Sequence, residues 1–364
     1  MKKRTFLKAL LATGGIAITA KHPLEKANPA LTGSAGISPP PASSSTVPEL
    51  VESSPQEEYE LGRLQQSELR PEFVHNEFHD HHDHDDLVPS ASNGSNEAII
   101  DLEAELAKAE TTEQRQQVIE QAPQRSVDEY LHKIRNFDAD FPSDIYLGES
   151  NALLLQPTIQ RLERVQGFVG HANFNLLSFE EMLYFARNYP EIGSFEKAEL
   201  AFLEEIFEAD ATAYGFFGEK VTPELNHRIR QKDVLKISNS GHYLHRGESL
   251  KHYEQIRKDV GNQLQLTSGI RNNVKQMHLF LAKAMQSNGN LSKASRSLAP
   301  PGHSFHNVGD FDVGKIGLGE QNFTSDFSNT EEFQRLIRLG YVDIRYTDDN
   351  QFGVRFEPWH IKLA

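Results

Sequence analysis

The stretch GHSFHNVGDFDVG, residues 302–314, contains four side chains that can bind a metal within ten residues: His303, His306, Asp310 and Asp312. Phenylalanine and valine residues are interleaved with them, and glycines flank the stretch. A turn uses glycine, asparagine or aspartate for its backbone geometry, and it has no use for a pair of histidines. The stretch therefore indicates a metal site, and a polar turn before a strand is the alternative interpretation.

The motif Glu357-Pro358-Trp359-His360 near the C-terminus supplies further polar side chains, and we expect it at the end of a strand. Pro358 favours an extended conformation of the residue before it. A polyproline-like segment has about three residues per turn, so Glu357 and His360 can point the same way. One of them can then be a general base and the other a metal ligand.

Together, His306, Asp312 and His360 form a candidate site for one catalytic zinc ion, with two histidines and one carboxylate. Three protein ligands leave a fourth position for water, which is the arrangement of catalytic zinc. Glu357 is then free to take a proton from water and to pass it to a leaving amine. Arg271 is the candidate for stabilising an oxyanion or holding a substrate carboxylate.

These motifs resemble those of the zinc D-alanyl-D-alanine carboxypeptidases of the VanY type, over roughly residues 236–364. The family's SGYR motif is similar to Ser268-Gly269-Ile270-Arg271, and Gln276 follows shortly after it. The family's E-x-x-H motif is matched by Glu357 and His360.

The metal motif of the family, S-x-H-x-x-G-x-A-x-D, resembles the segment from Ser304 to Asp312 with one departure. The family spaces its histidine and aspartate seven residues apart, whereas His306 and Asp312 are six apart. His303 and Asp310 have the sevenfold spacing, but the serine and glycine of the motif then fall out of place. We therefore interpret His306 and Asp312 as ligands, and His303 and Asp310 as residues that orient them.

The resemblance implies a small zinc peptidase domain with an antiparallel sheet, acting on peptidoglycan stem peptides of the cell wall. It implies removal of a terminal D-alanine, although a D,D-carboxypeptidase, an L,D-carboxypeptidase and an endopeptidase could share these residues. The other candidates for contacts with the ligands or the substrate are Ser268, Gln276, Ser304 and Trp359.

Composition narrows the class of function. The net charge of −15 argues against nucleic acid as a general partner, because phosphate binding needs a basic face. The chain has no cysteine, which excludes disulfides, thiolate ligands and a cysteine nucleophile. Any metal must therefore be held by histidine, aspartate or glutamate.

Residues 1–20 have the three-part form of an export signal, with a basic start, a short apolar run and small residues ending at Ala20. The run KRTFLK resembles a twin-arginine signal with Lys3 in place of the first arginine, so the Tat and Sec routes both stay open. We expect the protein in the periplasm or cell envelope, with the signal either cleaved or kept as an anchor.

Residues 21–96 are rich in proline and serine, which indicates a disordered linker. The linker contains a tract of histidines and aspartates at residues 75–86. This tract is either a solvated acidic segment or a tether that gathers extra zinc loosely.

Residues 97–235 carry apolar residues at helical spacing and form a predicted helical region. Ser178, followed by Glu181, is the signature of a capping box, and another helix is expected to start near Ser194. Several histidines show no paired ligand spacing and are expected to be satisfied or at the surface: His171, His227, His242, His245 and His252.

Residues 236–364 form the predicted peptidase domain. From about residue 261 we expect a strand, a helix, a second helix closed by Gly340, and a β-hairpin over 341–363. Strands and helices mix without regular alternation, which indicates an α+β fold.

Two other functions fit parts of the sequence. A non-enzymatic protein that binds zinc or the cell wall accounts for the histidine tract, but it requires neither Glu357 nor Arg271. A helical interaction protein with a degenerate peptidase tail accounts for the missing residue in the metal motif.

Overall fold

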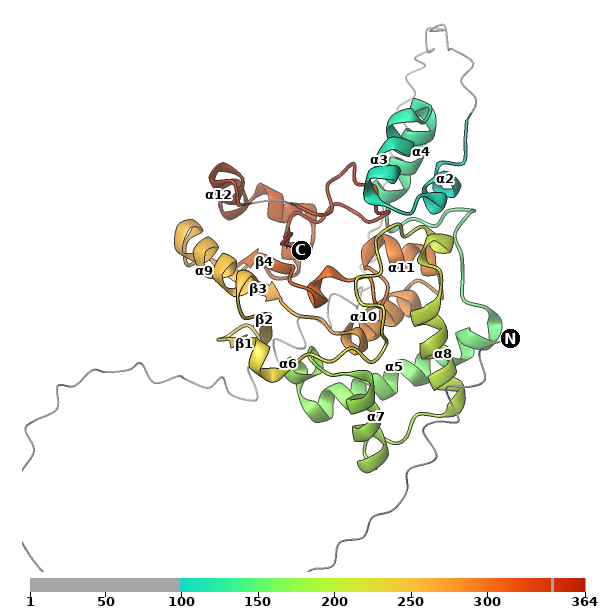
Figure 1. Cartoon of the computed structure of the whole chain (residues 1–364), viewed down its shortest axis with the longest axis vertical. Helices are drawn as coiled ribbons and strands as arrows, with labels where there is room; N and C mark the ends of the chain where they lie inside the picture. Colours follow the sequence, from blue (N-terminus) through green and yellow to red (C-terminus); the bar gives the residue numbers. More distant parts are fainter. Residues whose placement is uncertain (1–98, 342–343, 364) are drawn as a thin grey trace, which may run out of the picture. The chain divides into compact units, whose positions relative to one another are not determined.

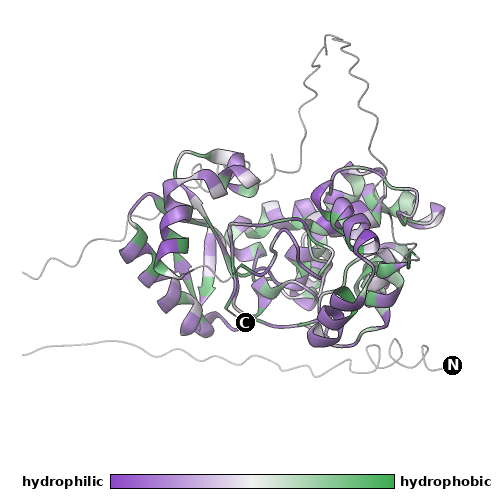
Figure 2. Cartoon of the chain, turned by 90° about the horizontal axis from the view of Figure 1, so that it is seen from above, coloured by the Kyte–Doolittle hydropathy of each residue, from purple (hydrophilic) through white to green (hydrophobic). Residues whose placement is uncertain are grey.

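The computed structural model describes residues 99–341 and 344–363, and all of them belong to the second of two units, 1–50 and 51–364. The predicted export signal, the predicted linker at 21–96 and its histidine tract lie outside the described residues. Within the described residues, none of the helices is both long and apolar enough to cross a bilayer. Hydrophilic and hydrophobic residues are instead mixed along the helices (Figure 2).

The first half of the described chain is helical, as predicted. Its helices are α2 (Leu102–Lys108), α3 (Thr112–Gln121), α4 (Gln124–Arg135), α5 (Glu149–Val169), α6 (His171–Phe174), α7 (Phe179–Asn188) and α8 (Lys197–Glu208). Two 3₁₀ helices follow, η2 (Ala211–Tyr214) and η3 (Gln231–Asp233).

The second half mixes short strands with helices. Its first elements are β1 (Val234–Ile237), β2 (His242–His245), α9 (Glu248–Val260), β3 (Leu264–Ser268), α10 (Asn273–Gln286) and α11 (Leu291–Ser297). Its last elements are η4 (Phe305–Asn307), β4 (Phe311–Lys315), η5 (Gly319–Phe323), η6 (Ser325–Asn329), α12 (Glu331–Leu339) and β5 (His360–Ile361). This confirms the α+β class.

Local sequence signals set several helix ends. Ser178 caps α7, and its capping box with Glu181 is formed in both directions. Gly340 ends α12 with φ 71, a left-handed conformation that glycine adopts without a steric penalty. Helix α8 begins at Lys197 instead of near Ser194, because Glu196 is the residue that caps it.

The sheet that carries the predicted motifs has three antiparallel strands in the order β3-β4-β5, and β1 and β2 form a separate hairpin. In this register Asp312 of β4 lies opposite His360 of β5. Helices α9 and α12 lie beside this sheet (Figure 1).

The prediction of a regular hairpin over 341–363 is wrong for the described part of that segment. Only His360–Ile361 forms a strand there, and Ile344 makes a single bridge to Ile361. The backbone between them pairs with other partners, since Arg355 N donates to Arg296 O and Phe352 O accepts from Phe217 N. These hydrogen bonds draw the segment away from a hairpin and towards the helices.

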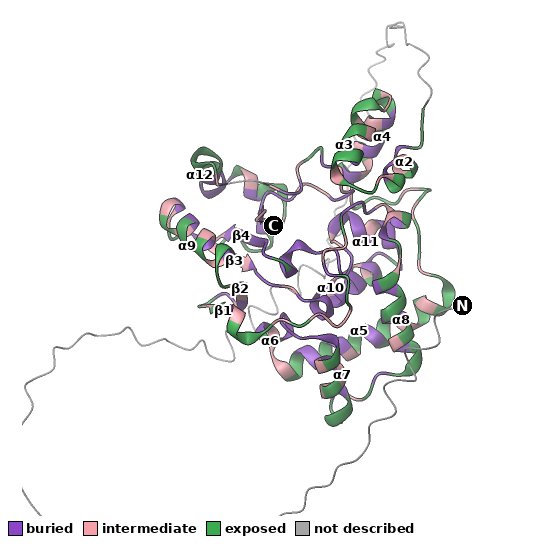
Figure 3. Cartoon of the chain, viewed as in Figure 1, coloured by how far each residue is buried: buried purple, intermediate pink, exposed green. Residues whose placement is uncertain are grey.

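Two main hydrophobic clusters meet around the predicted site. One joins α5, α7 and α8 to α10 and α11, and it includes Tyr346 and Val354 from the C-terminal segment. The other packs α9 and α12 against β3, β4 and Trp359. Figure 3 shows α10 and α11 mostly buried, because helices that precede them in the chain cover them. The predicted helical region and part of the predicted peptidase domain therefore share the first of these clusters.

Candidate metal and catalytic site

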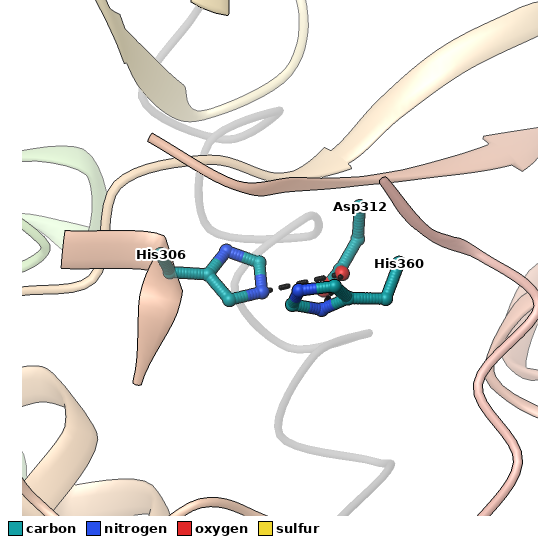
Figure 4. Close-up of side chains that lie close together, drawn as sticks. All are labelled: His306, Asp312 and His360. Atoms are coloured by element: carbon teal, nitrogen blue, oxygen red, sulfur yellow. Dashed lines mark ion pairs between the residues drawn. The ribbon is translucent and has the colours of Figure 1, made fainter. Parts of the chain in front are cut away.

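Three short elements bring the predicted ligands together. Asp312 comes from β4 and His360 from β5, where cross-strand pairing sets them opposite one another. His306 comes from the 3₁₀ turn η4, just before β4. All three side chains are buried and point towards one another (Figure 4).

The facing atoms of these side chains form a compact cluster. Asp312 Oδ1 lies 3.2 Å from His306 Nε2 and 3.2 Å from His360 Nδ1. One ligand atom from each residue lies within 4.8 Å of the others, and within the described residues this is the one such group of three or more potential ligands.

The hydrogen bonding of these three side chains also indicates a metal site, independently of the sequence motifs. Asp312 Oδ1, His306 Nε2 and His360 Nδ1 are all buried, yet none of them makes a hydrogen bond within the described residues. Buried polar atoms without a partner are rare, because each costs free energy of desolvation. Two imidazole nitrogens and one carboxylate oxygen are a ligand set of catalytic zinc.

In His306 and His360, the ring nitrogen that points away from the cluster makes a hydrogen bond to another residue. His306 Nδ1 lies 2.8 Å from Gly269 O, so it carries the proton and leaves Nε2 to face the cluster. His360 Nε2 lies 3.0 Å from Asp310 Oδ2, so Nδ1 faces the cluster. The structure thus places Asp312 among the three candidate ligand atoms and Asp310 behind His360.

Asp310 is itself fixed on both oxygens. Its Oδ2 accepts from Arg345 Nε at 2.7 Å, and its Oδ1 accepts from Leu363 N at 2.8 Å. Arg345 also stacks on the ring of Phe305, 3.4 Å from its centroid. The Asp310–Arg345 pair therefore sets the orientation of His360.

Burial and charge act in opposite directions on the titratable groups of the cluster. Burial disfavours the charged form of Asp312, but His306, His360 and Arg271 outweigh it and hold its pKa below the usual range. Burial lowers the pKa of His306 to about 4, with Arg271 adding to the effect. Burial also opposes protonation of His360, but Asp310 and Asp312 raise its pKa to about 9.

Glu357 lies at the edge of the cluster without belonging to it. Its Oε2 is 3.8 Å from His360 Nδ1, and its Oε1 is 3.8 Å from Arg355 Nε. Burial raises the pKa of Glu357 to about 7, although Arg355 and His360 act against the rise. A carboxyl group with a pKa near neutrality is suited to both accepting and donating a proton.

A pocket opens over the cluster. It is lined by Glu357 and by other predicted site residues: Ser268, Arg271, Gln276, Ser304 and Trp359. Arg271 Nη2 donates to Asp312 Oδ2 at 3.3 Å, so the guanidinium that lines the pocket is paired with a candidate ligand. Gln276 Nε2 donates to Ala299 O at 2.6 Å, while its Oε1 has no partner within the described residues.

His303 is the predicted site residue that the structure does not bring to the cluster. Its Nδ1 lies 3.1 Å from Gly218 O, and its ring packs edge-on against Phe216. Gly302, with φ 88, forms a turn directly before His303. After this turn the His303 ring packs against Phe216, in the first half of the described chain. Of His303 and Asp310, only Asp310 therefore contacts a candidate ligand as predicted.

Sequence reasoning missed several residues of the site. His242 was expected at the surface or satisfied; it is buried, with its Nδ1 3.4 Å from Asn175 Nδ2, and burial lowers its pKa to about 3. What the sequence did not predict is that His242 lines the pocket. Tyr346 lines the pocket with its ring centroid 5.0 Å from that of His360, and Arg345 pairs with Asp310. No local motif marks these residues, because their partners are distant in the sequence.

Comparison with known proteins supports the same part of the chain. Residues 245–364 match the family model of the VanY D-alanyl-D-alanine carboxypeptidases. No curated protein and no solved structure matches the chain. The C-terminal part of the chain thus carries a domain of this peptidase family.

Proposed function

We propose that the protein is an exported zinc metallopeptidase that hydrolyses peptidoglycan stem peptides and removes their terminal D-alanine. The observation that carries the proposal is the meeting, in one pocket, of Glu357 with three buried candidate ligand atoms that face one another without a hydrogen bond. A site that only stores metal has no need of a buried carboxyl group beside its ligands, because burial of a carboxylate costs free energy.

Each group of residues in the site has a separate role in the proposed amide hydrolysis. Zinc held by His306, Asp312 and His360 would supply a Lewis acid that lowers the pKa of water and polarises a carbonyl. Glu357 takes the proton from the attacking water and passes it to the amine that leaves. Arg271 offers its guanidinium to the negative charge that develops on the carbonyl oxygen, or to the terminal carboxylate.

The proposed place of action is the periplasm or cell envelope, and it rests on the form of residues 1–20. An exported enzyme would meet stem peptides there. The histidine tract at residues 75–86 would add loose zinc binding to the same chain.

The first experiment measures bound zinc by elemental analysis and, in the same sample, D-alanine release from a stem pentapeptide. One zinc per chain with D-alanine released is the expected result. A tetrapeptide and a cross-linked dimer, with products identified by mass, distinguish L,D-carboxypeptidase and endopeptidase activity. Zinc binding without hydrolysis of any of the three favours the non-enzymatic function.

The variant Glu357→Gln tests the general base separately from zinc binding. The variant should bind zinc as the wild type does, while its rate falls by about 10²–10⁴-fold, the usual contribution of a general base. Glu332→Gln is the matched control, since Glu332 is buried but pairs with Lys315 and does not line the pocket. Full activity of Glu357→Gln would contradict the proposed mechanism.

A further inference from the structure

The turn at residues 268–273, which carries Arg271, contacts two of the three predicted ligands. Gly269 O accepts the hydrogen bond from His306 Nδ1 at 2.8 Å, and Arg271 Nη2 donates to Asp312 Oδ2 at 3.3 Å. The position of this turn therefore sets the direction of the His306 ring and the charge that faces Asp312.

Backbone groups that precede the matched segment 245–364 hold this turn in place. Ile270 N donates to Tyr243 O at 2.8 Å, and Asn272 N donates to Asn175 O at 2.8 Å. Gly269 packs so closely on Tyr243 that a Cβ atom there would overlap the Tyr243 carbonyl oxygen. The turn is thus fixed from outside the segment that the family model matches.

Asn272 is the centre of this attachment and is fully buried. Its Nδ2 donates to Leu176 O at 3.2 Å and to His227 O at 3.1 Å. Its Oδ1 accepts from Asn273 N at 2.8 Å, which caps α10. One side chain therefore starts the helix after the turn and ties the turn to two separate segments of the helical region.

A second asparagine connects the same attachment to the His306 turn. Asn307 Nδ2 donates to Thr222 Oγ1 at 3.0 Å and to Asn272 Oδ1 at 3.3 Å. Asn273 Nδ2 adds a hydrogen bond to Glu224 O at 2.9 Å. We call Asn272, Asn273 and Asn307 the asparagine cluster.

Loss of a hydrogen-bond partner from the asparagine cluster would cost free energy, because the three side chains are buried. Its three members are at most 3% exposed, so water cannot replace a lost partner at its amide donors without opening the packing. The partners lie at residues 176, 222, 224 and 227, all of them before the matched segment. The metal cluster is therefore ordered through residues that the family match does not cover.

We infer that residues 175–243 are part of the catalytic apparatus and that Asn272 is the positioning residue that fastens the Arg271 turn and the His306 turn to them. The inference rests on the proposed function, on its zinc site for the metal readouts and on its peptidase activity for the kinetic readout. It gives the predicted helical region a defined role, which is to fix the direction of His306 and Arg271.

The test is Asn272→Asp in the full chain. Aspartate keeps the oxygen that caps α10, and both residues cap helices well, so the start of α10 is preserved. The substitution removes the amide donor and turns a carboxylate oxygen towards the carbonyls of Leu176 and His227. We expect affinity for zinc to fall by about 10–100-fold, as on removal of groups that orient metal ligands. We also expect a changed visible spectrum of the cobalt-loaded protein and a lower kcat with little change in KM.

Thr222→Val is the milder variant, and it tests the positioning role of the asparagine cluster if Asn272→Asp does not fold. It removes the hydroxyl that accepts from Asn307 and keeps the shape of the side chain. Thr158→Val is the matched control, because Thr158 is fully buried in α5 and its hydroxyl has no partner within the described residues. A weaker zinc affinity and an altered cobalt spectrum in Thr222→Val, against no change in Thr158→Val, support the inference.

A purely structural role for the asparagine cluster gives another result. The folded variants would then lose stability to urea, but keep wild-type zinc affinity, cobalt spectrum and kcat, and this outcome overturns the inference. If the wild type hydrolyses no stem peptide, the proposed function fails while the metal measurements still decide the role of Asn272.

Discussion

The orientation of His360 by Asp310 yields the sharpest prediction. Asp310 accepts hydrogen bonds on both oxygens, from His360 and Arg345 on Oδ2 and from Leu363 N on Oδ1. Asparagine has the same shape but a single acceptor oxygen. In Asp310→Asn the amide NH₂ must face a donor on one side, so the buried network is broken whichever way the amide turns.

Two separate effects of Asp310→Asn have known magnitudes, and the structure shows that both apply here. Loss of a carboxylate that orients a metal-binding histidine weakens metal affinity by about 10–100-fold, or roughly 1.4–2.8 kcal/mol. Loss of one partner from a buried ion pair costs about 3–5 kcal/mol of unfolding free energy. The ion pair is buried on both sides, with 6% of the Arg345 side chain and 0% of the Asp310 side chain exposed.

The chain contains a matched control at Asp144. Its carboxylate pairs with Arg296 at 2.7 Å, with 6% and 2% of the arginine and aspartate side chains exposed. Arg296 also stacks on an aromatic ring, that of Phe141, as Arg345 does on Phe305. Asp144 does not line the pocket over the metal cluster. Asp144→Asn should therefore lose stability similarly and keep its zinc affinity.

The assay measures zinc affinity by competition with a chelator and unfolding free energy by urea titration, for both variants and the wild type. We expect both variants to be less stable and only Asp310→Asn to bind zinc more weakly. Equal zinc affinity of folded Asp310→Asn and the wild type would refute the reasoning. An equal loss of affinity in Asp144→Asn would show that the effect follows stability instead of the orientation of His360.

Further predictions concern the metal, the turn and a remote helix. Removal of zinc by a chelator should lower the free energy of unfolding by about 2.7 kcal/mol relative to zinc at 100 times its dissociation constant, and a melting temperature indifferent to zinc would count against a native metal site. His306→Ala should bind no zinc in elemental analysis at stoichiometric metal, and retention of one tight zinc would remove His306 from the ligand set. Gly269→Ala should weaken zinc binding tenfold or more, because its Cβ atom displaces the turn that holds His306; unchanged affinity would show that the turn can shift freely. Thr111→Ala should cost about 1 kcal/mol in urea unfolding through loss of the capping box of α3, with activity unchanged; a loss of activity would mean that α3 acts on the site.

The sequence was informative wherever the physical cause is local. A helix cap depends on residues three positions apart, so Ser178 and Gly340 could be read directly. The donor types of the metal cluster also follow from the chain itself, because the absence of cysteine leaves histidine and carboxylates. The three residues that the cluster brings together, His306, Asp312 and His360, were among those predicted.

The different positions of Asp310 and Asp312 around His360 depend on strand pairing, which local sequence patterns do not give. Alternation along β4 turns Phe311 and Val313 into the hydrophobic core and Asp312 to the opposite face. Asp310, two residues before Asp312, reaches the same histidine from its other side. Motif spacing favoured Asp312 over Asp310, and the pairing of β4 with β5 places Asp312 beside His306 and His360 in the candidate ligand group.

Local sequence patterns predicted the helical region, the caps at Ser178 and Gly340 and the chemical groups available to the site. Tertiary structure alone decided the burial of Glu357, the pairing of Asp310 with Arg345 and the attachment of Asn272 to residues 175–243. These partners are separated by tens of residues along the chain, so no short-range pattern encodes them. They meet because the helical core and the sheet core pack on either side of one pocket, and burial then sets the pKa and the direction of each group.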